Sequence, residues 1–316
     1  MKPIARPYAP EDFQPVRDML VETWSAHQSP VNWDIARWNW CRYSGVPYLV
    51  NWPRNLSPTP AESLAGIAWW EAHLAVWEDG GRIVALVHTE STHLGECWIE
   101  HRPGYGAILP DALRWAEAHL ADEGGWLQVW AADRDPELVA ALVARGYRCR
   151  PEGHEPASRF AIGTPTNAKL PAGFAVASMA EDGDAARRAE CIGRGFGHAD
   201  SRDWSTPAHY RELLRAPDYD PSLDLHVIAP DGRYVSIALL WHDQHNHVGF
   251  LEPVATHPDF RRQGLGRAVI YEGIRRVAAR GATQVWVGSD QLFYRAIGFR
   301  VCCYGHAWSR PQESSV

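Results

Sequence analysis

The residues best suited to chemistry form one stretch, 254–270, in which an alternating apolar run leads into a proline-marked turn, two arginines and a Gly-x-Gly. A helix pattern follows directly. Arg261 and Arg262 supply positive charge, and Gly264 and Gly266 lack the Cβ atoms that would keep a ligand off the backbone. The first amides of a helix have no partner within it, so they and the positive end of the helix dipole attract an anion. The pattern therefore predicts a cradle for a diphosphate.

Two common phosphate loops do not fit, because no Gly-Lys-Ser/Thr follows and Val269 stands where a dinucleotide fingerprint has its third glycine. Arg-x-x-Gly-x-Gly between a strand and a helix instead resembles the acetyl-CoA loop of the GNAT superfamily of N-acetyltransferases. The preceding Leu-Glu-Pro-Val-Ala-Thr-His-Pro (251–258) strengthens the resemblance. So does 293–299, which is similar to the family's closing helix-to-strand turn with its tyrosine, here Tyr294. The family's usual Asn-x-x-Ala before that helix is replaced by residues 289–291, which leaves contacts to the far end of the cofactor open.

The resemblance implies acetyl-CoA as cosubstrate and an amine as acceptor. In this superfamily the pantetheine arm lies along the fourth strand like an added strand, at a bulge that splays the sheet. The resemblance assigns cofactor binding to Val254, Ala255, Thr256, Arg261, Arg262, Gln263, Gly264, Leu265, Gly266 and Arg267. An ordinary solvated helix start is the alternative for the arginines.

The candidate catalytic residues are Glu252 and Tyr294. A phenol is protonated at neutral pH, so Tyr294 can act as the general acid for the departing thiolate. Glu252 is the candidate base, because strand alternation places it on the same face as Val254 and Thr256. The alternatives are a packed tyrosine and a structural ion pair, and His257 is a weaker candidate base.

The acceptor is expected over the first helices of the C-terminal half, where His198, Asp203 and Trp204 offer an acidic and aromatic lining for a cationic amine. The histidines of 241–247 could be read as a metal site. Strand alternation would splay their imidazoles, so we expect no metal.

The composition is that of a globular protein of 316 residues, long enough for two domains. A net charge of −7 argues against binding to bulk nucleic acid or an anionic membrane. The absence of a long apolar run and of a signal-peptide pattern, with six cysteines in no regular framework, favours a cytoplasmic protein. The sequence leaves open whether the chain is a monomer or a homodimer.

The same order of elements occurs twice, on either side of a Pro/Gly-marked linker at 164–173. We expect two α/β domains with mixed sheets, a degenerate GNAT-like domain at 1–163 and an active one at 174–316. The distance from Gly81 to Gly104 is 23 residues, whereas that from Gly232 to Gly264 is 32. The first half therefore lacks the strand end, the turn and the arginine pair.

The first half is rich in tryptophan, with twelve of the sixteen before residue 131, and these could form core or a ligand wall. Tandem members of the superfamily such as mycothiol synthases also pair a degenerate and an active half, but no residue here identifies their acceptor. We expect an acetyl-CoA-dependent N-acyltransferase that transfers acetyl directly to a small-molecule amine. A non-catalytic CoA-binding sensor or scaffold is the alternative.

Overall fold

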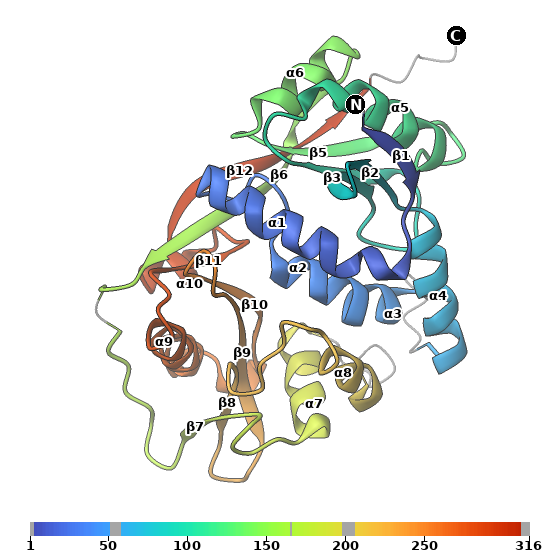
Figure 1. The fold of residues 1–316 in the computed structure, drawn as a ribbon. Coiled ribbons are helices and arrows are strands. Elements are labelled where there is room, and N and C mark those ends of the chain that lie inside the picture. Colours follow the sequence, from blue (N-terminus) through green and yellow to red (C-terminus); the bar gives the residue numbers. More distant parts are fainter. Residues whose placement is uncertain (1–2, 51–57, 165, 198–205, 311–316) are drawn as a thin grey trace. The chain divides into compact units, whose positions relative to one another are not determined.

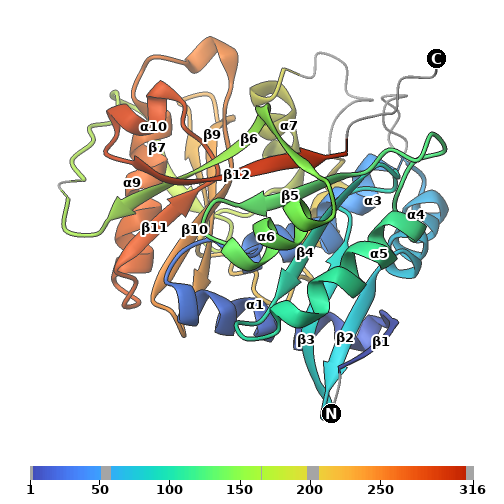
Figure 2. The same cartoon turned by 90° about the horizontal axis from the view of Figure 1, so that it is seen from above.

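The computed structural model describes residues 3–50, 58–164, 166–197 and 206–310. It divides the chain into two compact units (Figures 1 and 2). The first comprises Met1–Asp34, Leu64–Ala157 and Val301–Val316, and the second comprises Ile35–Ser63 and Ser158–Arg300. Each has its own apolar core and a mixed β-sheet flanked by helices, which confirms the expected α/β class. Within the described residues, no helix is long and apolar enough to cross a membrane.

The sheet of the first unit has the strand order β1-β2-β3-β4-β5-β12-β6. These strands are β1 (Ile4–Pro7), β2 (Ala75–Asp79), β3 (Arg82–His88), β4 (Glu96–His101), β5 (Gln128–Ala132), β12 (Arg300–Ser309) and β6 (Arg148–Ala161). β4 and β5 run parallel. The helices are α1 (Phe13–His27), α5 (Leu109–His119), α6 (Pro136–Ala144) and most of α4 (Pro60–Ala72). α5 packs on one face of the sheet and α1 lies on the other (Figure 1).

The sheet of the second unit continues from the end of β6 in the order β11-β10-β9-β8-β7. These strands are β7 (Ala175–Ser178), β8 (Asp224–Ile228), β9 (Tyr234–Asp243), β10 (Val248–Thr256) and β11 (Gln284–Val287). α9 (Leu265–Ala278) covers one face, and α7 (Ala185–Gly195) and α8 (Pro207–Leu213) lie on the other (Figure 1). α10 (Leu292–Ala296) precedes β12.

The last strand of each half of the chain pairs with a strand of the other half. β12 pairs antiparallel with β5, and Ser158–Ala161 of β6 pair antiparallel with β11. The compact units are therefore interleaved along the chain, and they differ from the sequential domains at 1–163 and 174–316 that we expected. The last strand of either half can complete the ladder of either sheet, so the sequence pattern of a strand does not identify its partner.

A second departure is the segment that contains α2 (Ile35–Trp40), a π-helical turn (Cys41–Gly45) and α3 (Val46–Leu49). It comes from the first half but belongs to the second unit, where α2 contacts β9 and β10. Trp38 is fully buried, so at least one of the clustered tryptophans is core rather than ligand wall.

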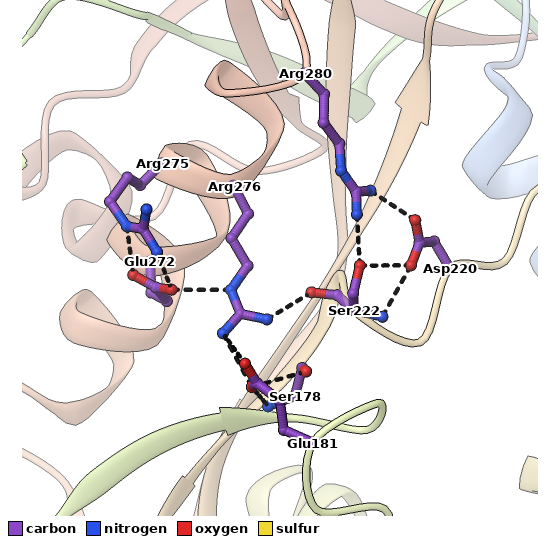
Figure 3. Close-up of polar contacts among 8 residues, drawn as sticks. All are labelled: Ser178, Glu181, Asp220, Ser222, Glu272, Arg275, Arg276 and Arg280. Carbon is purple, nitrogen blue, oxygen red and sulfur yellow. Dashed lines mark hydrogen bonds and ion pairs between the residues drawn. The ribbon is translucent and has the colours of Figure 1, made fainter.

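The C-terminal part of α9 is fixed by a polar network (Figure 3). Arg276 contacts Glu272 at 2.8 Å, the Ser222 carbonyl oxygen at 2.9 Å and Glu181 at 3.0 Å. Arg280 contacts Asp220 at 2.6 Å. Cations near a helix C-terminus also interact favourably with its dipole. The network ties α9 to the segments that follow β7 and precede β8, and so fixes where its N-terminus lies.

The last residue of α7, Gly195, makes a close approach to β10 that we expect to be essential for packing. A Cβ there would lie 2.6 Å from the Cβ of Ala255 and 3.1 Å from the backbone nitrogen of Thr256. Because β10 cannot move away freely, Gly195→Ala should lower the free energy of unfolding by about 1–3 kcal/mol. Gly288→Ala, which meets nothing within 4 Å, should change it by less than about 0.5 kcal/mol. Equal effects of the two substitutions in urea titrations would contradict this packing.

Candidate active site

β10 parts from β11 in the middle of the second unit. The parallel pairing covers Val248, Gly249 and Phe250, and within the described chain no further β11 residue pairs with β10. On its other edge, β10 pairs with β9 up to Leu251 and again from Val254, with a register shift between them. This shift is a β-bulge, and it lies where the two strands separate.

The open edge of β10 presents backbone amides. The N–H of His257 donates to the Val235 carbonyl at 2.9 Å, on the β9 side. Amide directions alternate along a strand, so the N–H groups of Val254 and Thr256 point toward the edge that β11 has left. Two amides are therefore available to an extended ligand.

The N-terminus of α9 lies next to this edge. Gly264 is its N-cap residue with φ 79°, a left-handed conformation that favours glycine. A Cβ on Gly266 would lie 3.2 Å from the Thr256 Oγ1 and 3.3 Å from the Phe293 ring. Gly264 thus allows the left-handed turn that begins α9, and Gly266 allows α9 to pack closely against Thr256 and Phe293. Leu265 is buried and Gln263 is exposed.

The three arginines of the loop have different surroundings. Arg261 donates to the carbonyl oxygens of Thr256 (3.2 Å) and Gly195 (2.8 Å), so its side chain ties the loop to β10 and α7. Arg262 is exposed with φ 62°. The Arg267 guanidinium lies over Gly264, 3.8 Å from the position of a Cβ there. All three residues are exposed, and they differ in that the Arg261 side chain is held by backbone carbonyls.

Tyr294 and Glu252 lie within electrostatic range of each other. Tyr294 is 8% exposed and packs edge-on against Phe293 and Phe299. Its burial, and then the Glu252 carboxylate, raise the pKa of Tyr294 to about 12. The phenol is therefore protonated at neutral pH and can donate a hydrogen bond.

Regular strand alternation, from which we placed Glu252 on the face of Val254 and Thr256, does not hold here. The bulge inserts one extra residue between Leu251 and Val254, and side-chain alternation does not continue across it. Leu251 and Val254 both pack against the core under α9 although they are three residues apart. Glu252 is half-buried at the bulge itself.

The other predicted residues are His257 and the three acceptor residues. His257 accepts a hydrogen bond from the Asp259 amide through Nδ1, and burial lowers its pKa, so it caps a short 3-10 turn. His198, Asp203 and Trp204 lie outside the described residues. In the described part of the chain, no group of three or more His, Cys, Asp or Glu residues could hold a metal ion.

Sequence reasoning missed Trp241, whose indole N–H donates to the Glu252 carbonyl oxygen at 2.9 Å. It also missed α2, which contacts β10 from the first half of the chain. Both contacts are long-range, and no local pattern indicates them.

Residues 194–299 match the acetyltransferase (GNAT) family. A mycothiol acetyltransferase from Cellulomonas flavigena is 27% identical over 286 residues, which cover 82% of this chain and 79% of that protein. One from Kineococcus radiotolerans is 32% identical over 136 residues, 41% of this chain, and the match spans only 44% of that protein.

A tandem GNAT protein from the clavulanic acid biosynthesis pathway has the same fold over 98% of both chains, with a TM-score of 0.60 and 13% identity. The family match coincides with the bulge, the cradle and Tyr294. Residues 194–299 therefore match the GNAT acetyltransferase family, and the chain as a whole has the fold of a tandem GNAT protein.

Proposed function

We propose that the second unit transfers acetyl from acetyl-CoA directly to a primary amine of a small molecule, and that the first unit is not catalytic. The GNAT family implies acetyl-CoA as donor. The observation that carries the proposal is the coincidence of an open strand edge at Val254–Thr256 with a glycine-opened helix start at Gly264–Gly266.

The donor fits these residues in two places. The diphosphate would lie on the amides at the start of α9, with Arg262 and Arg267 beside it. The pantetheine arm would pair with the Val254 and Thr256 amides, one of which would polarise the thioester carbonyl. Arg261 holds the loop that joins the two places.

In the reaction, the amine nitrogen attacks the thioester carbonyl carbon and the carbon–sulfur bond breaks. One amine proton passes to Glu252, and Tyr294 gives its proton to the departing sulfur. Glu252 then releases its proton to solvent and Tyr294 takes one up, which restores both groups. A free thiol has a pKa of about 8.5, well below that of Tyr294. Transfer of the phenol proton to the thiolate is therefore unfavourable while the Glu252 carboxylate is charged. Once Glu252 is protonated, its charge no longer raises the pKa of Tyr294, so proton donation becomes easier.

Among its described residues, the first unit has no equivalent cradle. A Cβ on Gly106 would lie 2.9–3.1 Å from the carboxyl atoms of Glu137, so a protein carboxylate lies against the corresponding loop. A negative charge there repels a diphosphate. Leu142 stands in α6, where the second unit has Tyr294 in α10. These differences support catalysis by the second unit.

Two observations indicate the class of the acceptor. Two relatives are named for mycothiol, which supports a small molecule as acceptor. The half-buried carboxylate of Glu252 favours an amine, because it can attract the ammonium form and accept its proton.

Cofactor binding can be tested by reversing one charge at each end of α9. Arg267→Glu places a carboxylate beside the cradle and should raise the KM for acetyl-CoA about tenfold or more. Arg275→Glu makes the same change near the other end of the helix and should leave this KM within about twofold. Steady-state kinetics that show the same KM for both variants would exclude a diphosphate at this helix start.

The role of Tyr294 can be tested with a matched phenol. Tyr294→Phe should lower kcat about 100-fold, as expected for loss of a proton donor. Tyr271→Phe, which removes a hydroxyl that donates to the Ile297 carbonyl in the same core, should lower kcat less than about threefold.

The raised pKa of Tyr294 adds a pH readout to that experiment. The donor is present below its pKa of about 12 and is lost only as the pH rises through that value. The kcat/KM of the wild type should therefore show no alkaline fall from this group up to a pH of about 10.5. Equal kcat values for both phenylalanine variants would remove Tyr294 from the reaction.

Assignment of the chemistry to one unit predicts the number of CoA molecules bound. Titration calorimetry should give one CoA per chain, because Glu137 fills the corresponding loop of the first unit. Arg267→Glu should weaken this single site. A second site of similar affinity that survives Arg267→Glu would show that the first unit also binds CoA.

A further inference from the structure

At the β10 bulge, a side chain of β9 bonds a backbone carbonyl of β10. The register of β10 with β9 passes from Leu251↔Leu240 to Val254↔Ala238 across the bulge. The carbonyl oxygen of Glu252 accepts from the Trp241 indole N–H, at 2.9 Å. Trp241 is 1% exposed, so this hydrogen bond lies in the interior, where an unsatisfied carbonyl is costly.

Trp241 is itself held by a buried network on the same side of the sheet. The Tyr219 ring packs against it edge-on, with centroids 6.4 Å apart at 74°. The Tyr219 hydroxyl donates to Asp224 at 3.1 Å and hydrogen-bonds the Tyr210 hydroxyl at 2.8 Å. Asp224 forms a buried ion pair with Arg188 at 3.0 Å. These contacts leave the indole little freedom to rotate.

The network thus connects the buried residues of α7 and α8 to the peptide group between Glu252 and Pro253. A shift of this peptide would move the Glu252 carboxylate and the amide of Val254 together. In the proposed reaction Glu252 takes the amine proton and the Val254 amide contacts the reacting end of the donor. Misplacement by about 1 Å should therefore lower the rate more than the affinity for CoA. α9 is held separately, by the contacts of Arg276 with Glu181 and of Arg280 with Asp220.

We propose that Trp241 is a positioning residue, which fixes the bulge of β10 through the Glu252 carbonyl and so aligns Glu252 and the Val254 amide for transfer. This inference rests on the proposed function of the second unit. Trp241 acts directly on the backbone of β10, and it affects catalysis only through the position of that backbone.

The test compares Trp241→Phe with Trp70→Phe. Trp70 is also fully buried and its indole N–H donates to the Thr89 carbonyl at 2.6 Å, but it lies in the first unit. Both variants lose the same ring volume and the same kind of hydrogen bond. Hydrogen–deuterium exchange of the peptide 248–257, kcat, the KM for acetyl-CoA and the thermal midpoint are measured for both.

Trp241→Phe should speed exchange in 248–257 and lower kcat about tenfold, with the KM for acetyl-CoA within about twofold of the wild type. Trp70→Phe should lower the thermal midpoint similarly without either effect. Unchanged exchange in Trp241→Phe would overturn the inference, and so would faster exchange with unchanged kcat. If the wild type acetylates no amine in a broad screen, the proposed function fails, whereas the exchange result still decides whether Trp241 fixes the bulge.

Discussion

The structure of the second unit depends on one parting of strands. β10 leaves β11 after Phe250, and a strand without a neighbour has backbone donors that need another partner. An exposed edge of this kind ordinarily favours aggregation, unless it is short, bulged or covered. Here it is short, it begins at a bulge, and it opens beside the positive end of α9. The same geometry that leaves these amides unpaired makes them a site for an extended, anionic ligand.

Contacts made by α9, by the loop before it and by α7 restrain the position of this edge. The network of Arg276 and Arg280 fixes the far part of α9, and Arg261 ties the loop before α9 to the carbonyls of Thr256 and Gly195. Gly195 in turn allows α7 to lie against β10. Polar contacts with backbone carbonyls recur because each fixes a segment without occupying the site. This is how a loop with two glycines can be held open in one conformation.

Sequence reasoning was strongest where chemistry depends on local order. The strand at 248–256, the Gly-x-Gly before α9 and the tyrosine of α10 are all contiguous patterns. It failed where partners are distant. The exchange of β6 and β12 between sheets, the packing of α2 in the second unit and the hydrogen bond of Trp241 join residues that no periodicity relates. The prediction that Glu252 shares a face with Val254 and Thr256 failed because the bulge adds a residue and so interrupts the regular alternation of side chains.

The central claim is that a CoA thioester binds along the open edge of β10. A crystal structure with CoA tests it most directly. We expect the diphosphate to lie on the amides from Gly264, the pantetheine arm to pair with Val254 and Thr256, and the sulfur to lie next to Tyr294. CoA bound elsewhere on the chain, with this edge closed by side chains, would contradict the account.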